Sequence, residues 1–478
     1  MTSHEVSAAP WEFSPLLFMT GLALFAGIAI DFVPELIWHD QQRMEQIVLL
    51  LIAALALATI WRKSLLVTLA RLPTPIRLAL PLGFTLGCTS AVLAAYPRFA
   101  LLEWGTLLLL LGVAFVLAEQ TRRGGVGFDT WAIRLVVALA AVIALKIMTG
   151  YVATIVEGAR LNTLQLFEGT FSNRRVFGQV ASMAIPLLAY PLLSTEMPRV
   201  RRWSLFALLA VWWMLVIVSG TRGTWMALAV AAVVLAAVAW RASSGWLRMQ
   251  AWAFGAGALL FAILFVGLPA WLELDASLEN RFVNPATLSG RGELWALAWG
   301  EIQAHPWLGI GPMHLASIHN GFGAHPHNAV LQLAAEWGVP AALAFVAPVA
   351  AGLFYLLLRI RRQETSVNAL LICLTASLLA ASAQSMVDGV IVIAYTQTWL
   401  VLIAGWVLGV YFRDGARAPV ISDFRMMRLG VPVLSLFAFA GLLNGVLPEI
   451  FNRAEVTQAY ADAGKLIPPR YWGVGWIP

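Results

Sequence analysis

The chain has 478 residues, of which 60% are hydrophobic and only 12% are charged. Soluble domains carry about 25% charged residues, so this composition excludes a water-soluble protein and predicts an integral membrane protein. The net charge of +6 follows membrane topology instead of forming a basic tract, and we expect no nucleic-acid partner. Cys88 and Cys373 both lie in apolar runs and predict neither a disulfide nor a metal site.

Long apolar runs without strand-type alternation predict transmembrane helices. The runs lie near residues 15–33, 45–61, 78–96, 99–119, 132–155, 177–194, 203–220, 223–240, 251–272, 327–358, 368–387, 391–412 and 430–447. We therefore expect an all-α polytopic membrane protein with about 12 transmembrane helices, in a range of about 11 to 13. One long polar loop, residues 273–326, interrupts the series.

Basic residues gather in alternate loops, which the positive-inside rule assigns to the cytoplasm. These loops hold Arg62, Lys63, Arg71 and Arg77, then Arg122, Arg123 and Arg134, then Arg199, Arg201 and Arg202, then Arg241 and Arg248, then Arg359, Arg361 and Arg362, then Arg413, Arg417, Arg425 and Arg428. The opposite side, before the C-terminal tail, carries eight arginines: Arg43, Arg98, Arg160, Arg174, Arg175, Arg222, Arg281 and Arg291. These arginines oppose the rule, so we expect an anionic ligand or a structural partner to hold them. Lys146 lies in the middle of a span, where either a function or a helix carbonyl would account for it.

The stretch Glu273–Gly338, which contains the long loop, carries five of the seven histidines. Its segment Arg291–Ala304 predicts an amphipathic helix in the membrane interface. The apolar face of that helix holds Leu294, Trp295, Ala298, Trp299 and Ile302. Farther along, Ala324-His-Pro-His-Asn328 directly precedes an apolar span. Because proline suits the first turn of a helix, Pro326 places His327 and Asn328 at a helix start.

These residue types suit one kind of chemistry. A neutral imidazole transfers protons near neutral pH, and the positive end of a helix dipole keeps it uncharged. Guanidinium groups stay charged and grip phosphate oxygens in pairs. His327 with the arginines therefore predicts a site that removes a proton from a hydroxyl and stabilises a departing phosphate.

Other interpretations of the same residues stay open. His327 alone would equally serve as a cap or interface residue, and His325 is not distinguished from it. Arg174 and Arg175 would also suit lipid headgroups, and Arg222 would suit carbonyl groups in its tight turn. His305, His314 and His319 read as loop residues. The histidine spacing fits no familiar zinc site, and the acidic pair of Glu273 and Asp275 is typical of a solvated loop, so we expect no metal.

Three motifs resemble a known bacterial family. They are Arg291-Gly-Glu-Leu-Trp295, His305-Pro-Trp-Leu-Gly-Ile-Gly311, and His327-Asn328 followed by Gly338. They are similar to the domain shared by O-antigen ligases, O-antigen polymerases and protein O-oligosaccharyltransferases. The ligase pattern has histidine, then Asn, Ser or Gln, nine residues, a glycine, and Gly, Thr or Tyr three positions later. His327, Asn328 and Gly338 match, whereas Ala341 departs from the last position.

The resemblance covers roughly residues 176–409 and implies three parts. Residues 1–175 would be N-terminal transmembrane helices, residues 176–447 a ligase- or polymerase-type transmembrane domain that includes the loop, and residues 448–478 a C-terminal tail. The fold would be of the GT-C glycosyltransferase type, in the bacterial inner membrane, with its active site on the periplasmic side.

The resemblance also implies an activity and its substrates. An O-antigen ligase transfers polysaccharide from undecaprenyl pyrophosphate to a sugar hydroxyl of lipid A–core, with inversion and without a metal or other cofactor. His327 would be the general base, and Arg222, Arg291 and either Arg174 or Arg175 would hold the pyrophosphate. From their place beside His327, we also expect His325 and Asn328 to bind the pyrophosphate or the glycan. The alternatives are an O-antigen polymerase, a protein O-oligosaccharyltransferase and, from another class, a lipid-linked oligosaccharide flippase, which would line a mid-membrane path with ionisable residues.

Overall fold

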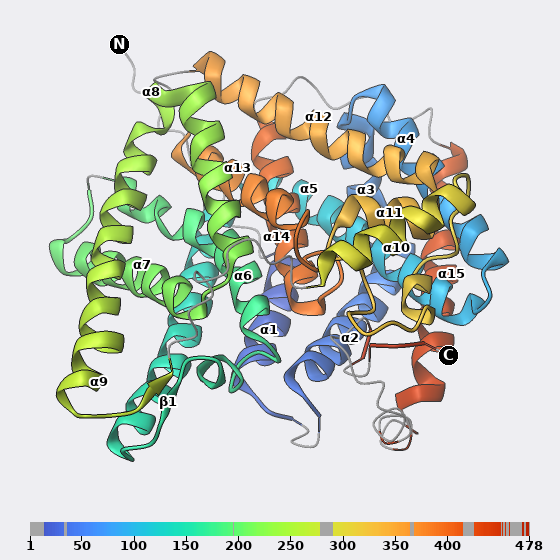
Figure 1. Ribbon diagram of the computed structural model, residues 1–478. Coiled ribbons are helices and arrows are strands. Elements are labelled where there is room, and N and C mark those ends of the chain that lie inside the picture. Colours follow the sequence, from blue (N-terminus) through green and yellow to red (C-terminus); the bar gives the residue numbers. More distant parts are fainter. Residues whose placement is uncertain are drawn as a thin grey trace, which may run out of the picture.

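The computed structural model describes residues 14–32, 36–194, 196–277, 290–363, 368–413 and 425–450. Residues 452, 455, 458, 471, 472 and 475–477 of the C-terminal segment are also described. Nearly all regular structure in these ranges is α-helical (Figure 1). The exception is a two-residue parallel pair of strands, β1 (Leu161–Asn162) with β2 (Ala276–Ser277). This pair joins the polar segment around residues 161–162 to the start of the long loop.

The longer helices are α1 (Pro15–Ala29), α2 (Trp38–Ala58), α3 (Arg62–Arg71), α4 (Thr74–Leu93), α5 (Pro97–Val156), α6 (Arg174–Leu188), α7 (Arg199–Ser219), α8 (Arg222–Phe261), α10 (Arg291–Ala304), α11 (Ala329–Trp337), α12 (Val339–Gln363), α13 (Ala369–Gln384), α14 (Ala394–Arg413) and α15 (Arg425–Ile450). Short pieces join them: η1 (Gln165–Phe167), η2 (Tyr190–Leu193), the π-helix η3 (Ala262–Gly267), α9 (Leu268–Trp271) and η4 (His314–Ser317).

Within the described ranges, nine helices are long and apolar enough to cross a membrane, which confirms a multi-pass α-helical membrane protein. Two of them, Pro97–Val156 and Arg222–Trp271, have 60 and 50 residues. A bilayer core takes about 20 helical residues, so each has the length for two crossings. Non-helical backbone at Gly125 (φ 55°) and at Ala239 (φ −146°) breaks them, and Figure 1 shows α8 turning back at its upper end. The number of crossings predicted from the sequence stays a prediction.

Small residues set the closest helix contacts in the core. In α14, a Cβ on Gly405 would lie 2.7 Å from the carbonyl oxygen of Ala114, and one on Gly409 would lie 2.5 Å from that of Ala118. These glycines stand four residues apart, the spacing at which one face of a helix can approach its neighbour closely. α5 therefore packs backbone to backbone against α14, next to a buried ion pair between Asp129 and Arg413.

The predicted span at residues 327–358 starts too early, because the chain breaks at Gly338 into two helices: the short α11, and α12, which is long and apolar enough to cross a membrane. Gly338 has φ 85°, and a Cβ there would lie 2.2 Å from the carbonyl oxygen of Trp307. The amides of Ile310 and Gly311 donate to the carbonyls of Ala335 and Glu336 at the end of α11. The glycines of the His305–Gly311 motif and Gly338 thus let the loop close over that end, and α11 is joined to the loop as well as to the bundle.

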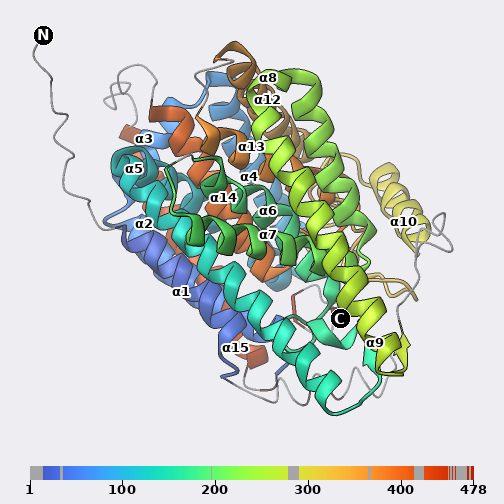
Figure 2. The ribbon, with the colours of Figure 1, turned by 90° about the vertical axis from the view of Figure 1, so that its left-hand side faces the viewer.

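The predicted amphipathic helix is confirmed as α10, which lies beside the packed helices and not among them (Figure 2). Leu294, Ala298 and Ile302 are buried, and Ala298 and Ile302 pack against residues of α11 and η4. Trp299 is 54% exposed, and its predicted place in the membrane interface stays a prediction. Trp295 instead donates from its indole nitrogen to the carbonyl of Pro326, 2.9 Å away, and thereby holds α10 against the segment that carries His327.

The described part of the C-terminal segment returns to the side of the molecule that carries residues 273–326, hereafter the loop side. The amide of Ile477 donates to the carbonyl of Ala316 in η4. The carbonyl of Tyr471 accepts from the buried side chain of Arg43 in α2. The segment thus connects the long loop to the bundle.

A candidate active site at four helix N-termini

Four helices begin at, or directly after, residues that the sequence singled out. α6 begins at Arg174, α8 at Arg222 and α10 at Arg291, while Asn328 is the N-cap of α11. The first turn of a helix has unpaired N–H groups and a partial positive charge. Four such ends, three of them with an arginine at the first position, form a region suited to an anion.

A glycine brings α6 against α8. A Cβ on Gly178 would lie 2.4 Å from the hydroxyl oxygen of Thr224 and 2.7 Å from that of Thr221. At the same contact, a Cβ on Gly220 would lie 4.0 Å from a guanidinium nitrogen of Arg174, which is itself buried. The starts of α6 and α8, and hence their arginines, are therefore neighbours.

The turn between α13 and α14 joins α8 to α11. Asn328 accepts from the amides of Val330 and Leu331 and donates to the carbonyl of Met386. The amide of Ala329 donates to the carbonyl of Ser385. On the other flank of the turn, a Cβ on Gly223 would lie 4.0 Å from a carboxylate oxygen of Asp388. Both polar atoms of the Asn328 side chain thus bond to the protein and position α11, whereas a contact with glycan stays a prediction.

His327 lies just before the helix and not in its first turn, which corrects the expectation drawn from Pro326. Its φ of 52° is in the left-handed region, an uncommon conformation for a residue other than glycine. The His325 ring packs edge-on at 4.1 Å between centroids, and a Cβ on Gly389 would lie only 2.7 Å from that ring. His327 is 7% exposed, so its ring is held in one place by contacts on several sides.

The surroundings of His327 keep its imidazole neutral. Burial lowers the pKa of His327 to about 3, and the nearby positive charges of Arg175 and Arg291 act in the same direction. Arg175, at the start of α6, and Arg291, at the start of α10, therefore both lie near this histidine. The sequence-based expectation of an uncharged imidazole agrees with this geometry.

Asp388 is the principal site residue that sequence reasoning missed. A carboxylate oxygen lies 3.9 Å from Nδ1 of His327, and both side chains are buried. Burial raises the pKa of Asp388, and the amide of Gly389, Arg175, Arg291 and a hydrogen bond from Gln179 counteract part of that rise. The signal was available: Asp388 is an acid in a short turn between two apolar spans, on the side opposite the basic loops.

A chain of polar side chains leads from the α7–α8 turn to Asp388. The hydroxyl oxygens of Ser219 and Thr221 are 2.8 Å apart, and those of Thr221 and Thr224 are 3.0 Å apart. The amide of Gln384 lies 3.2 Å from Thr224 and 3.4 Å from Asp388. Each member is buried, so a shift of the α8 start is transmitted to the carboxylate next to His327.

The arginines that oppose the positive-inside rule fall into two groups. Arg98 pairs with Glu449, Arg160 pairs with Asp275 at 3.0 Å, and Arg43 donates to Gln46, Gln397 and main-chain carbonyls. These three form the first group. The second group comprises Arg174, Arg175, Arg222 and Arg291, all at helix starts around His327. Arg281 lies outside the described residues.

The other loop histidines stand apart from this centre. His314 is buried and accepts from the amide of Tyr96 through Nε2, while Nδ1 lies 2.9 Å from the carbonyl of Pro312. His319 contacts the ring of Trp476, and the ring of His305 is more than half exposed. Among the described residues, no three His, Cys, Asp or Glu side chains cluster as a metal site would require.

Comparison with known proteins identifies one matching family. Residues 205–346 match the family model described as O-antigen ligase. The matched stretch lies inside residues 176–409, where the motifs predicted the resemblance, and includes Arg222, Arg291 and His327. No curated protein matches the chain.

Proposed function

Because this chain carries the domain shared by O-antigen ligases, O-antigen polymerases and oligosaccharyltransferases, we propose that it is an O-antigen ligase. Members of the family are bacterial membrane-bound, glycosyltransferase-like enzymes with lipid-linked glycan substrates. In this proposal the donor is polysaccharide on undecaprenyl pyrophosphate, and the acceptor is a sugar hydroxyl of lipid A–core. The reaction takes place on the periplasmic side of the inner membrane, in a GT-C-type fold.

The convergence of four helix N-termini around a neutral, buried histidine is the observation that carries this proposal. A pyrophosphate has several charged oxygens, and Arg174, Arg175, Arg222 and Arg291 lie in the first turns of three helices, where their guanidinium groups would bind those oxygens. The partial positive charge at each helix start acts in the same direction as these guanidinium groups. Arg222 and Arg291 are in the matched family region, whereas Arg174 and Arg175 complete the cluster from outside it.

The proposed reaction is a direct displacement with inversion. The acceptor hydroxyl attacks the anomeric carbon, and its proton passes to His327. The bond between that carbon and the phosphate oxygen breaks, and undecaprenyl pyrophosphate leaves with the electron pair. The arginines stabilise the charge on the leaving oxygen, and Asp388, 3.9 Å from Nδ1, stabilises the imidazolium.

Donor binding would strengthen the base. In the unliganded protein Arg175 and Arg291 lower the pKa of His327. A bound pyrophosphate would neutralise those charges, so the pKa of His327 would rise when both substrates are in place. The histidine would then be reactive only in the complex that can transfer glycan.

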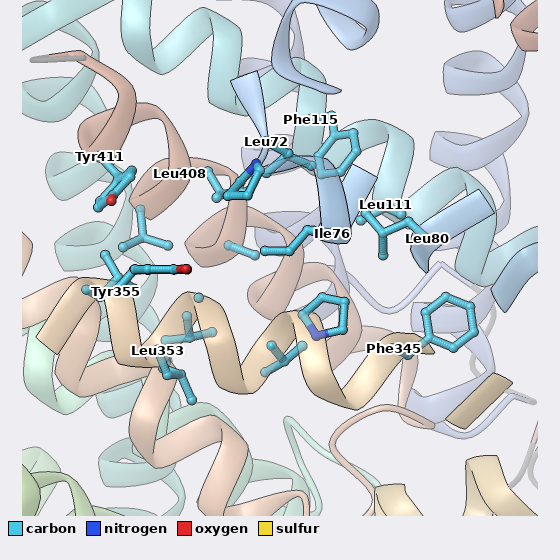
Figure 3. Close-up of a pocket in the computed structure, with 18 of the residues that line it drawn as sticks. Leu72, Ile76, Leu80, Leu111, Phe115, Phe345, Leu353, Tyr355, Leu408 and Tyr411 are labelled. Atoms are coloured by element: carbon cyan, nitrogen blue, oxygen red, sulfur yellow. The ribbon is translucent and has the colours of Figure 1, made fainter. Parts of the chain in front are cut away.

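An apolar pocket offers a path for the hydrocarbon part of the donor. It has a volume of about 390 Å³ and lies between α4, α5, α12 and α14 (Figure 3). Leu333 of α11 and Ile391 of the Asp388 turn line it, and it extends to Tyr411 near the other end of α14. Its lining has no charged side chain. It therefore suits a polyprenyl chain whose pyrophosphate lies at the helix starts.

One reconstitution separates the related activities. Purified protein is mixed with lipid-linked polymer and lipid A–core, and the products are resolved by size and by acceptor. We expect polymer to move to the core, and to stop moving in a His327→Ala variant that remains folded. Growth of the lipid-linked chain would instead indicate a polymerase, and glycan on an added acceptor protein would indicate an oligosaccharyltransferase. Translocation of the lipid without transfer would indicate a flippase.

A further inference from the structure

A second pocket, which is polar, lies away from the candidate active site, at the loop-side part of α5. It has a volume of about 200 Å³. Lys146, Gly150 and Thr154, which lie four residues apart on one face of α5, form one wall. Arg160, Gln165 and neighbours from the segment after α5 form the other. None of its lining residues belongs to the cluster around His327.

The contacts of Lys146 are typical of the membrane interface, and its bond to a helix carbonyl is one of the two explanations that the sequence left open. Its ammonium group donates to the carbonyl of Ile28 in the last turn of α1 and lies 4.3 Å from the ring centroid of Trp38, the first residue of α2. After α1, Asp31 and Phe32 are non-helical and exposed, Phe32 to 57%. Exposed irregular backbone is not tolerated in the hydrocarbon region, and tryptophan is typical of the headgroup level.

The pocket has two cations in an otherwise uncharged polar lining. The pair of Arg160 with Asp275 engages Nε of the guanidinium and is mostly exposed, at 66% and 70% for the two side chains. Such a surface pair contributes little stability, and the guanidinium has four further N–H groups. Thr154, Gln165 and Thr170 add hydroxyl and amide groups. Gly150 and Gly169 have no side chain, and a Cβ at either position would meet nothing within 4 Å, which leaves room for a ligand.

We propose that this pocket binds the phosphate of a membrane-lipid headgroup on the loop side. A volume of about 200 Å³ is below the roughly 300 Å³ at which pockets for whole drug-sized ligands begin, so it suits a headgroup whose chains stay in the bilayer. Arginine grips phosphate in pairs, and lysine adds a point charge. The phosphate has two possible sources, a bulk phospholipid or a phosphorylated glycolipid such as the proposed acceptor.

Lipid titrations of the full-length purified protein, read by native mass spectrometry, test the proposal. The probes are phosphatidylglycerol, bis-phosphorylated lipid A and, as a phosphate-free lipid, monogalactosyldiacylglycerol. The variants are Lys146→Met/Arg160→Gln and Arg160→Gln alone. Arg248→Gln, on an exposed arginine of α8, is the matched control. Melting temperatures show which variants fold.

We expect the double variant to bind one or both phosphate lipids at least tenfold more weakly, as loss of about 1.4 kcal/mol or more of binding energy would give. Arg160→Gln should show a smaller loss, and Arg248→Gln none. The lipid whose affinity falls is the source of the phosphate. Unchanged affinity for both phosphate lipids in folded variants would overturn the proposal, and so would an equal loss for the galactolipid. If the double variant does not fold, Arg160→Gln decides by the same criterion. Because no glycan transfer is measured, this result is independent of the proposed enzyme activity.

Discussion

Asp388 provides the sharpest test of the proposed mechanism, because nothing in the family motifs points to it. The change is Asp388→Asn, which keeps the shape of the side chain and removes its charge. The amide oxygen of asparagine can still accept from the amide of Gly389, as the carboxylate does at 2.9 Å. Gln179, whose Oε1 is buried without a hydrogen-bond partner among the described groups, can rotate its amide to receive the new N–H group.

The size of the effect follows from the distance to His327. Two unit charges 3.9 Å apart interact by about 4 kcal/mol at an effective dielectric constant of about 20. The imidazolium exists only after the acceptor proton has moved, so most of this interaction appears in the transition state and little in the ground state. We therefore expect the transfer rate to fall by about 10²- to 10³-fold, with little change in the apparent affinity for the donor.

Single-turnover transfer from preloaded donor to lipid A–core measures this rate. Asp129→Asn is the matched control, because Asp129 is also buried and bonds to Arg413 and Trp406 but lies in another part of the bundle. It should lower the melting temperature and leave the rate of the folded fraction close to that of the wild type. A rate for Asp388→Asn within threefold of the wild type would refute the role of this carboxylate.

Three further predictions follow from the same geometry. First, Gly178→Ala must move α6 and α8 apart by about 1 Å to relieve the 2.4 Å contact with Thr224, and a misplacement of that size lowers the transfer rate about 10²-fold. The control Gly255→Ala, where a Cβ meets nothing within 4 Å, should be neutral. Equal transfer rates for the two variants would contradict the idea that the contact at Gly178 positions the arginines. Second, with a pKa of about 3, His327 stays about 99% neutral at pH 5, whereas a pKa of 6.5 would leave about 3% neutral. The pH profile of kcat/KM, which reports the free enzyme, should therefore lack an acid limb near pH 6.5. An acid limb that disappears in His327→Gln would show that the pKa of His327 is not lowered. Third, Gly352 lines the apolar pocket, and a Cβ there meets nothing within 4 Å. Gly352→Phe should raise KM for a long-chain polyprenyl donor but not for a short-chain analogue. An equal effect on both donors would exclude the pocket as the path of the polyprenyl chain.

The sequence predicted the helical membrane fold and α10 because both depend on local patterns. Apolar runs and the spacing of Leu294, Ala298 and Ile302 are visible along the chain. The break at Gly338 was missed because Ala329–Trp337 is apolar for a different reason: it packs against α10 and η4 as well as the bundle. Hydropathy does not distinguish a helix buried in an extramembrane loop from a helix in lipid.

The site was only partly predictable for a related reason. His327 and Arg291 lie in motifs with recognisable spacing, and Arg222 lies in a polar turn between apolar spans. Asp388, Gln179 and Gln384 are single residues at the ends of apolar runs, and only the packing of α13 against α6 and α8 brings them to His327. The hydrogen bond between Gln384 and Thr224 joins residues 160 positions apart. Such a contact leaves no periodic pattern in the sequence.

The arginines that oppose the positive-inside rule show how topology can be combined with packing to find such a site. The rule marks these residues as exceptions but does not say why each is there. Arg43 bonds to Gln397, Arg98 to Glu449 and Arg160 to Asp275, and Arg160 also lines a polar pocket. The remaining described exceptions are Arg174, Arg175, Arg222 and Arg291, and they meet at the starts of α6, α8 and α10 around His327. Their convergence on a few helix ends, more than the presence of any one of them, is what an anionic substrate requires.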